Sequence, residues 1–133
     1  MRALLLACLA TLTVVACSDG PTAVDHSGTY HLVSINEIEP PILWNDSPEL
    51  RTVITGGVIV LRRDNSFEDR LDATLEVDPP SEPVPWARPS FGTWTVEGQT
   101  LSMTYTNGQT HPAQLSDGRI TQTLDDLRYV YQK

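Results

Sequence analysis

The sequence predicts an all-β fold, namely an eight-stranded antiparallel up-and-down barrel preceded by a signal peptide. Three observations indicate this fold class. Strand-like runs in the last third of the chain are separated at nearly even spacing by turn dipeptides, among them Asn107-Gly108 and Asp117-Gly118. Residues 66–77 alternate between apolar and polar side chains, which is typical of a strand with one face in a core and one in water. The chain of 133 residues is long enough for one domain and hardly for two.

Residues 1–16 are predicted to form the signal peptide. Arg2 provides a positive start, and the run from Ala3 to Ala16 is apolar apart from two threonines. Such a run is too short for a comfortable membrane-spanning helix, which needs about 20 residues. Residues 17–26 are small, polar and acidic, and we expect them to be a tether to a barrel domain over residues 27–133.

The end of this segment, Val14-Val15-Ala16-Cys17, resembles the lipobox of bacterial lipoproteins. The resemblance implies that cleavage falls before Cys17, that its sulfur carries a diacylglyceryl group, and that its amino group is acylated with a fatty acid such as palmitate. Two or three acyl chains suffice for stable membrane anchoring. The expected location is therefore the bacterial cell envelope, and Ser18 in place of an aspartate favours the outer membrane. The alternative is an unmodified Cys17 beside a conventional cleavage site.

The charge balance argues against nucleic acid and anionic lipid headgroups as partners. The chain has 9 Lys and Arg residues against 17 Asp and Glu residues, and removal of Arg2 with the signal peptide leaves 8 against 17, a net charge of −9. Cys17 would then be the only cysteine, which excludes an internal disulfide. The fold must rest on its apolar core.

Eight strands are expected, three before a proline-rich segment and five after it. They cover residues 27–35, 51–63, 66–77, 91–96, 99–105, 110–115, 119–124 and 127–132. The Gly56-Gly57 pair predicts a bulge or bend, which a closing barrel requires. Pro112 has no backbone N–H to donate to a neighbouring strand, so its strand should be an edge strand or irregular at that point. Eight strands make a barrel that side chains fill or that holds one small ligand.

Two proline-containing segments are predicted to lack regular structure. Residues 36–50 contain three prolines and Trp44, and we expect a long loop that either covers a cavity as a flap or plugs the end of the barrel. Residues 78–90 contain five prolines and Trp86, which predicts an extended, polyproline-like crossing at one end of the barrel. A proline-rich ligand for an aromatic groove is the alternative for the second segment.

Asp69 is the one residue that breaks the alternation of residues 66–77, because it falls on the apolar side. A carboxylate in a barrel interior could orient a ligand or act as an acid with a raised pKa. The alternative is a hydrated side chain near the barrel mouth.

Several short motifs resemble those of the lipocalin-like proteins of bacterial envelopes. They are Gly28-Thr29-Tyr30 with Leu32-Val33-Ser34, Gly57-Val58-Ile59-Val60-Leu61 running into Asp64-Asn65-Ser66-Phe67, and Gly92-Thr93-Trp94-Thr95-Val96. The resemblance covers nearly all of residues 27–133 and implies the fold, with carriage of a ligand in the barrel as a further expectation.

Two functions follow as hypotheses for a monomer. In the first, the barrel binds a small apolar ligand lined by Tyr30, Trp94, Met103 and Tyr105, with Trp44 over the mouth. In the second, the barrel is filled, and Trp44 and Trp86 contact an envelope protein, as in an inhibitor-like or structural module. The sequence has no nucleophile elbow, Cys-His pair or metal-ligand cluster, so neither an enzyme nor a cofactor is expected.

Overall fold

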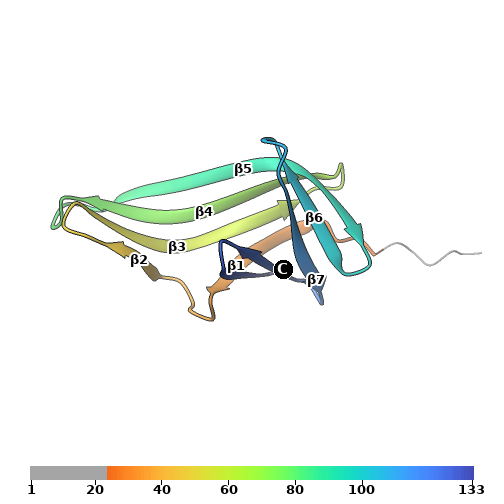
Figure 1. The fold of residues 1–133 in the computed structure, drawn as a ribbon, viewed down its shortest axis with the longest axis horizontal. Coiled ribbons are helices and arrows are strands. Elements are labelled where there is room, and N and C mark those ends of the chain that lie inside the picture. The colour runs from red at the N-terminus through yellow and green to blue at the C-terminus, as the bar shows by residue number, and fades with distance from the viewer. Residues whose placement is uncertain (1–23) are drawn as a thin grey trace, which may run out of the picture.

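The computed structural model describes residues 24–133, which form nine strands in one antiparallel sheet (Figure 1). The strands are β1 Gly28–Ile35, β2 Ile42–Asp46, β3 Leu50–Leu61, β4 Ser66–Val77, β5 Val84–Glu97, β6 Thr100–Tyr105, β7 Thr110–Ser116, β8 Arg119–Leu124 and β9 Leu127–Gln132. The part of the chain that carries the predicted signal peptide and Cys17 lies outside the described residues.

Eight of these strands close into a barrel because β1 pairs on both of its sides. It pairs with β9 from His31↔Gln132 to Ile35↔Tyr129, and with β3 from Gly28↔Leu61 to His31↔Val58. The strands from β3 to β9 each pair with the next along the chain, so the connectivity is up-and-down. The predicted fold class, an all-β eight-stranded antiparallel barrel, is confirmed.

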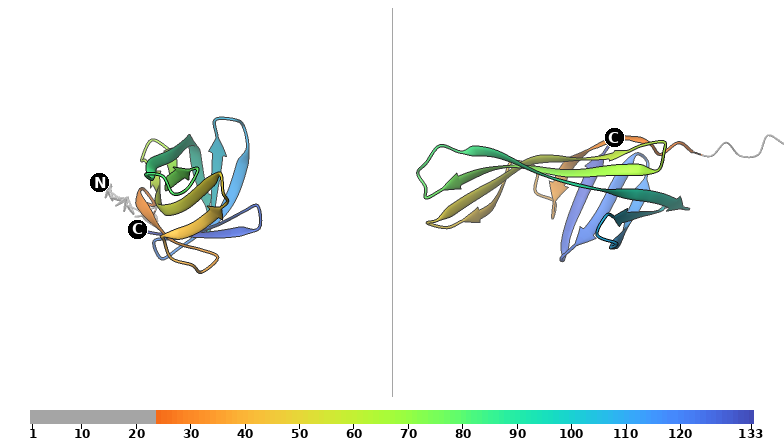
Figure 2. Two further views of the ribbon diagram at one scale, coloured as in Figure 1. Left: turned by 90° about the vertical axis from the view of Figure 1, so that its left-hand side faces the viewer. Right: turned by 90° about the horizontal axis from the view of Figure 1, so that it is seen from above.

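The strands β3, β4 and β5 extend well beyond the barrel as a curved projection (Figures 1 and 2). The closing strands cover only one half of them, since β1 reaches β3 only at Val58–Leu61 and β6 reaches β5 only from Gly92 onward. The remaining halves pair with one another, and β2 adds to β3 as a fourth strand. We call this projection, residues 42–57 and 70–91, the arm.

The prediction of a loop over residues 36–50 is wrong in part. Pro40 and Pro41 precede β2 and Pro48 lies in the turn after it, so the prolines bracket a five-residue strand without interrupting it. Trp44 lies at an irregularity of the β2–β3 register, between Leu43 and Asn45. Trp44 therefore belongs to a strand of the arm.

The prediction of an irregular crossing over residues 78–90 is wrong from Val84 onward, where β5 begins and pairs with β4. Pro85 and Pro89 are tolerated because β6 does not reach this part of β5. The backbone on that side of β5 therefore has no neighbouring strand to which it must donate hydrogen bonds. Pro112 is accommodated in a similar way, since β8 reaches β7 only from Ala113 onward. The bulge predicted at the glycine pair is confirmed by a register shift between Ile54 and Gly56.

The core fills the half of the barrel where the described chain enters. Tyr30, Ile59, Phe67, Leu101, Met103 and Ile120 are all at most 1% exposed. At the same end the Trp94 indole donates to the carbonyl of Arg62 at 3.0 Å, and the Tyr30 hydroxyl donates to the carbonyl of His26 at 2.7 Å. The arm leaves from the opposite end, as both views show (Figures 1 and 2).

Candidate ligand site at the mouth of the barrel

A cavity of about 300 Å³ opens at the end of the barrel from which the arm projects. Strands β4 and β5 and the β6–β7 and β8–β9 hairpins contribute to its wall. It is lined by Asp69, Leu71, Arg88, Ser90, Tyr105, Asn107, Gln109, His111, Leu124, Asp125, Tyr129 and Tyr131. Polar and aromatic side chains therefore predominate over aliphatic ones.

The alternation of the strands places the central residues of this wall. Asp69 lies on the inward face of β4 between Phe67 and Leu71, and its partner on β5 is Ser90. Tyr129 and Tyr131 are two apart on β9 and so point to the same side of the sheet. Tyr105 ends β6, opposite Gly92.

Gly92 makes room for this arrangement. A Cβ at this position would lie 2.0 Å from the carbonyl oxygen of Thr104 and 2.7 Å from the Phe67 ring. The close approach lets Phe67 and Tyr105 stack edge to face at 5.0 Å, and Tyr105 stacks in the same way on His111 at 5.4 Å. The ring of Tyr105 is thereby held between two neighbours.

The hydroxyl of Tyr105 donates a 2.8 Å hydrogen bond to Oδ2 of Asp69. Removal from water raises the pKa of Asp69, and the bond from Tyr105 opposes part of that rise. Burial and the neighbouring Asp69 carboxyl raise the pKa values of Tyr105 and Tyr131 above the ordinary value. Both hydroxyls keep their protons at neutral pH, and that of Tyr105 donates to Asp69.

Gln122 adds a polar group behind this wall. It is 1% exposed, it pairs with Tyr129 across the β8–β9 ladder, and its amide lies beside Tyr105. Its Nε2 has no hydrogen-bond partner within the described chain. A buried donor without a partner costs roughly 1–3 kcal/mol. Gln122 is not among the residues that line the cavity, so it supports Tyr105 from behind and is not itself part of the cavity wall.

The structure separates the residues that the sequence predicts as a ligand site. Tyr30, Trp94 and Met103 belong to one buried cluster of core residues, and none of them lines the cavity. Tyr105 does line it, whereas Trp44 is 46% exposed on β2 of the arm.

Sequence reasoning did not assign Arg88, His111, Gln122, Tyr129 or Tyr131 to a site. Alternation along residues 127–132 places Tyr129 and Tyr131 on one face together with Leu127, and the alternation of Ile120, Gln122 and Leu124 also indicates an inward glutamine. No pattern in the sequence points to Arg88, because it lies in the proline-rich segment that was predicted to be irregular.

Within residues 24–133, no three His, Cys, Asp or Glu side chains gather into a group that could hold a metal ion. The same residues contain no helix with the length and hydrophobicity needed to cross a membrane. Comparison of the chain with protein-family models, curated proteins and solved structures gives no match. The geometry of the site is therefore the basis for inferring its function.

Proposed function

We propose that this protein is a lipid-anchored protein of the bacterial envelope whose lipocalin-like barrel binds one small ligand at its mouth, without catalysis. The observation that carries the proposal is the cavity in which Asp69, Tyr105 and two further tyrosines face a common space. Concave sites with a few convergent polar groups among aromatic side chains are typical of small-molecule binding.

The cavity indicates which ligands fit. A long apolar chain is disfavoured, because Trp94, Met103 and Leu101 occupy the interior beyond the mouth. A volume of about 300 Å³ lies at the small end of the range for ligand pockets. We propose a compact ligand with a flat apolar part against the tyrosine rings and a hydrogen-bond acceptor near the hydroxyl of Tyr131. This changes the expected apolar ligand into one that also carries polar groups.

The anchor at Cys17 and the envelope location rest on the lipobox resemblance. The position of the mouth is consistent with them, because the described chain enters at the other end of the barrel (Figure 2). A tether of residues 17–26 would then leave the mouth open toward the space away from the membrane. A monomer suffices for this function, since one barrel contributes the whole cavity wall.

Native mass spectrometry of the full chain, purified from its own envelope and released from detergent in the gas phase, tests the proposal. We expect a bound small molecule, and we expect Ser90→Phe to remove it because the new ring fills the cavity beside Asp69. Thr95→Phe is the matched control, since Thr95 lies on the same strand with an exposed side chain. A clean apo mass, or a bound mass that survives Ser90→Phe, would contradict the proposal.

A filled barrel that acts as an interaction module is the second candidate. The observation that favours it is the exposed apolar surface of the arm, where Leu43, Trp44, Val77, Val84 and Trp86 are all exposed. Protein interaction through the arm is compatible with ligand binding at the mouth, because these five exposed side chains do not line the cavity.

A further inference from the structure

The inner face of the arm continues the apolar face of the barrel interior. Ile42, Ile54 and Ala73 at its base are buried, whereas no element of residues 24–133 covers the part near the tip. Paired residues of neighbouring strands share a face, so the pairs Leu50↔Val77, Leu75↔Val84 and Ala73↔Trp86 lie on the same side as Phe67 and Leu71. Toward the tip of the arm these side chains are open to solvent, with Val77 59%, Val84 60% and Trp86 39% exposed. Large apolar side chains gathered on one surface indicate an interaction site.

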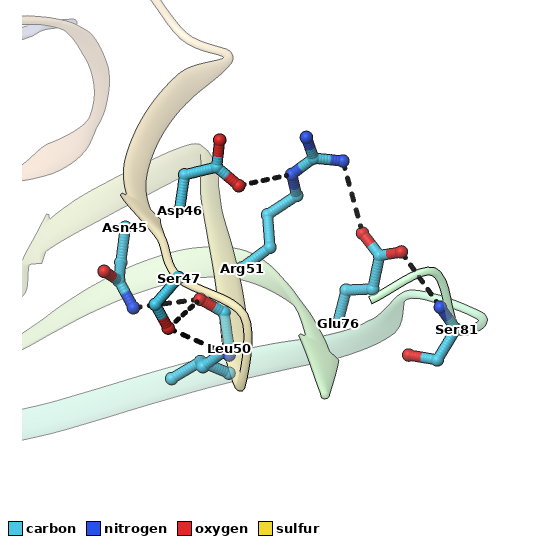
Figure 3. Close-up of polar contacts among 7 residues, drawn as sticks. All are labelled: Asn45, Asp46, Ser47, Leu50, Arg51, Glu76 and Ser81. Atoms are coloured by element: carbon cyan, nitrogen blue, oxygen red, sulfur yellow. Dashed lines mark hydrogen bonds and ion pairs between the residues drawn. The ribbon is translucent and has the colours of Figure 1, made fainter. Parts of the chain in front are cut away.

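The outer face of the arm is of the opposite character. Arg51 lies between Asp46 and Glu76 across three paired strands, with Nε 3.2 Å from the Asp46 carboxylate and Nη1 3.5 Å from that of Glu76 (Figure 3). The backbone N–H of Ser81 donates to the other oxygen of Glu76 at 3.0 Å (Figure 3). Near the tip the outer face therefore carries this charged cluster, although Leu43 is also exposed on that face, while the inner face exposes Val77, Val84 and Trp86.

The edges of the arm are poorly suited to strand addition. Pro85 and Pro89 remove donors along the free part of β5. On the other side, β2 departs from regular register at Trp44. A partner of the arm would therefore meet its face and would not extend the sheet.

The charge at the tip of the arm selects the kind of partner. The two turns at the tip, residues 46–49 and 78–82, contain four acidic residues and no basic one. Two copies whose arms packed in parallel would bring their acidic tips together, and an anionic lipid surface would be repelled. We infer that the inner face of the arm is a docking surface for another protein, one that presents apolar side chains bordered by Lys and Arg residues.

The position of the arm supports this assignment. The arm projects from the end of the barrel opposite to the one where the described chain enters (Figures 1 and 2). A partner on the arm is thus kept apart from the tether. The inference does not depend on a ligand in the cavity, since Val77, Val84 and Trp86 do not line it.

Site-specific photo-crosslinking in the cells that naturally contain the protein tests this inference. Benzoylphenylalanine is placed in the full chain at Val84 or, as the control, at Thr95 on the barrel part of the same strand. We expect one protein adduct from Val84 and none from Thr95. Mass spectrometry of the adduct should identify a crosslinked segment with apolar and basic residues.

Charge and apolar variants then separate specific docking from adventitious capture. In binding assays with the purified partner, Glu82→Lys at the tip should weaken binding roughly ten-fold, because it adds a repulsive charge. Glu97→Lys, at the far end of β5, is the matched control and should leave binding unchanged. Val84→Ser should weaken binding, whereas Val24→Ser, at another exposed valine, should not.

Four outcomes would overturn the inference. They are a Val84 adduct with a second copy of this chain, an adduct with phospholipid, the absence of an adduct, and protein binding that Glu82→Lys leaves unchanged. None of these outcomes concerns the cavity, so docking on the arm and ligand binding at the mouth are tested independently.

Discussion

Strands β3, β4 and β5 each have a half in the barrel and a half in the arm, and the inward-facing side chains of the two halves differ in burial. Ile59, Phe67 and Trp94 lie in the core, whereas Val77, Val84 and Trp86, farther along the same inward faces, are exposed. Alternation continues through both halves, so it does not decide burial. What decides it is whether β1 and β6 to β9 close over the strands, and they do so in one half only.

The largest expected effect concerns a close contact inside the barrel. Gly92→Ala should lower the free energy of unfolding by about 3 kcal/mol, because the new methyl group meets the Thr104 carbonyl and the Phe67 ring. Gly56→Ala is the control at the base of the arm, where no atom lies within 4 Å of the added Cβ, and it should change stability by less than about 1 kcal/mol. Urea titrations of both variants measure this difference. Similar losses for the two would contradict the close backbone approach at Gly92 and the open space at Gly56.

A second difference should appear in native-state hydrogen exchange. The arm has half of its inner face in water, so we expect its backbone amides to exchange through local opening, at roughly 100-fold lower protection than those of β6, β8 and β9. Protection factors for Val53 and Leu75 in the arm, compared with Leu101 and Ile120 in the barrel, test this. Equal protection would mean that the arm and the barrel unfold as one unit.

The sequence was sufficient for the barrel and insufficient for the arm. Turn dipeptides and period-two alternation are local signals, and they located the strands that close the barrel. The arm forms where β3, β4 and β5 extend beyond the ends of their neighbouring strands. Where those neighbours end depends on pairing between segments far apart in sequence. One signal was available in the sequence, because the strands predicted at residues 51–63 and 66–77 are about twice as long as those predicted at residues 119–124 and 127–132.

The candidate site could be predicted only in part. Asp69 was identified because it breaks the alternation, and the structure places it on the cavity wall bonded to Tyr105. Tyr30, Trp94 and Met103 have the same inward pattern as Tyr105, yet they fill the core. The difference depends on how cross-strand neighbours pack at each level of the barrel, and alternation within one strand carries no information about it.

The third prediction concerns Asp69, which lies near the boundary between the two halves. Burial raises its pKa in the folded protein, so the folded state binds its proton more tightly than the unfolded state does, and stability falls as pH rises from below the unfolded pKa through the folded one. Asp69→Asn should therefore raise the melting temperature near pH 7 and have little effect near pH 3 in thermal denaturation.

Asp64→Asn is the control of opposite sign. Hydrogen bonds from Ser66 lower the pKa of Asp64, so its contribution to stability is present above the unfolded pKa and is lost as pH falls through the folded one. This variant should lower the melting temperature near pH 7. If both asparagine variants shift it in the same direction, the assigned environment of Asp69 is wrong.

The smallest expected effect comes from removing either of two similar ion pairs, one on the arm and one on the barrel. Arg51 pairs with Glu76 on the arm and Arg62 with Glu68 on the barrel, and the two arginine side chains are 45% and 44% exposed. Exposed pairs of this kind contribute at most about 1 kcal/mol. Arg62→Gln should therefore lower the melting temperature slightly. Arg51→Gln should leave it unchanged and speed hydrogen exchange only in the arm, because the arm opens before the barrel unfolds. If Arg51→Gln instead lowers the melting temperature as much as Arg62→Gln does, the arm is an integral part of the cooperative fold, and its open apolar face has to be explained within that unit.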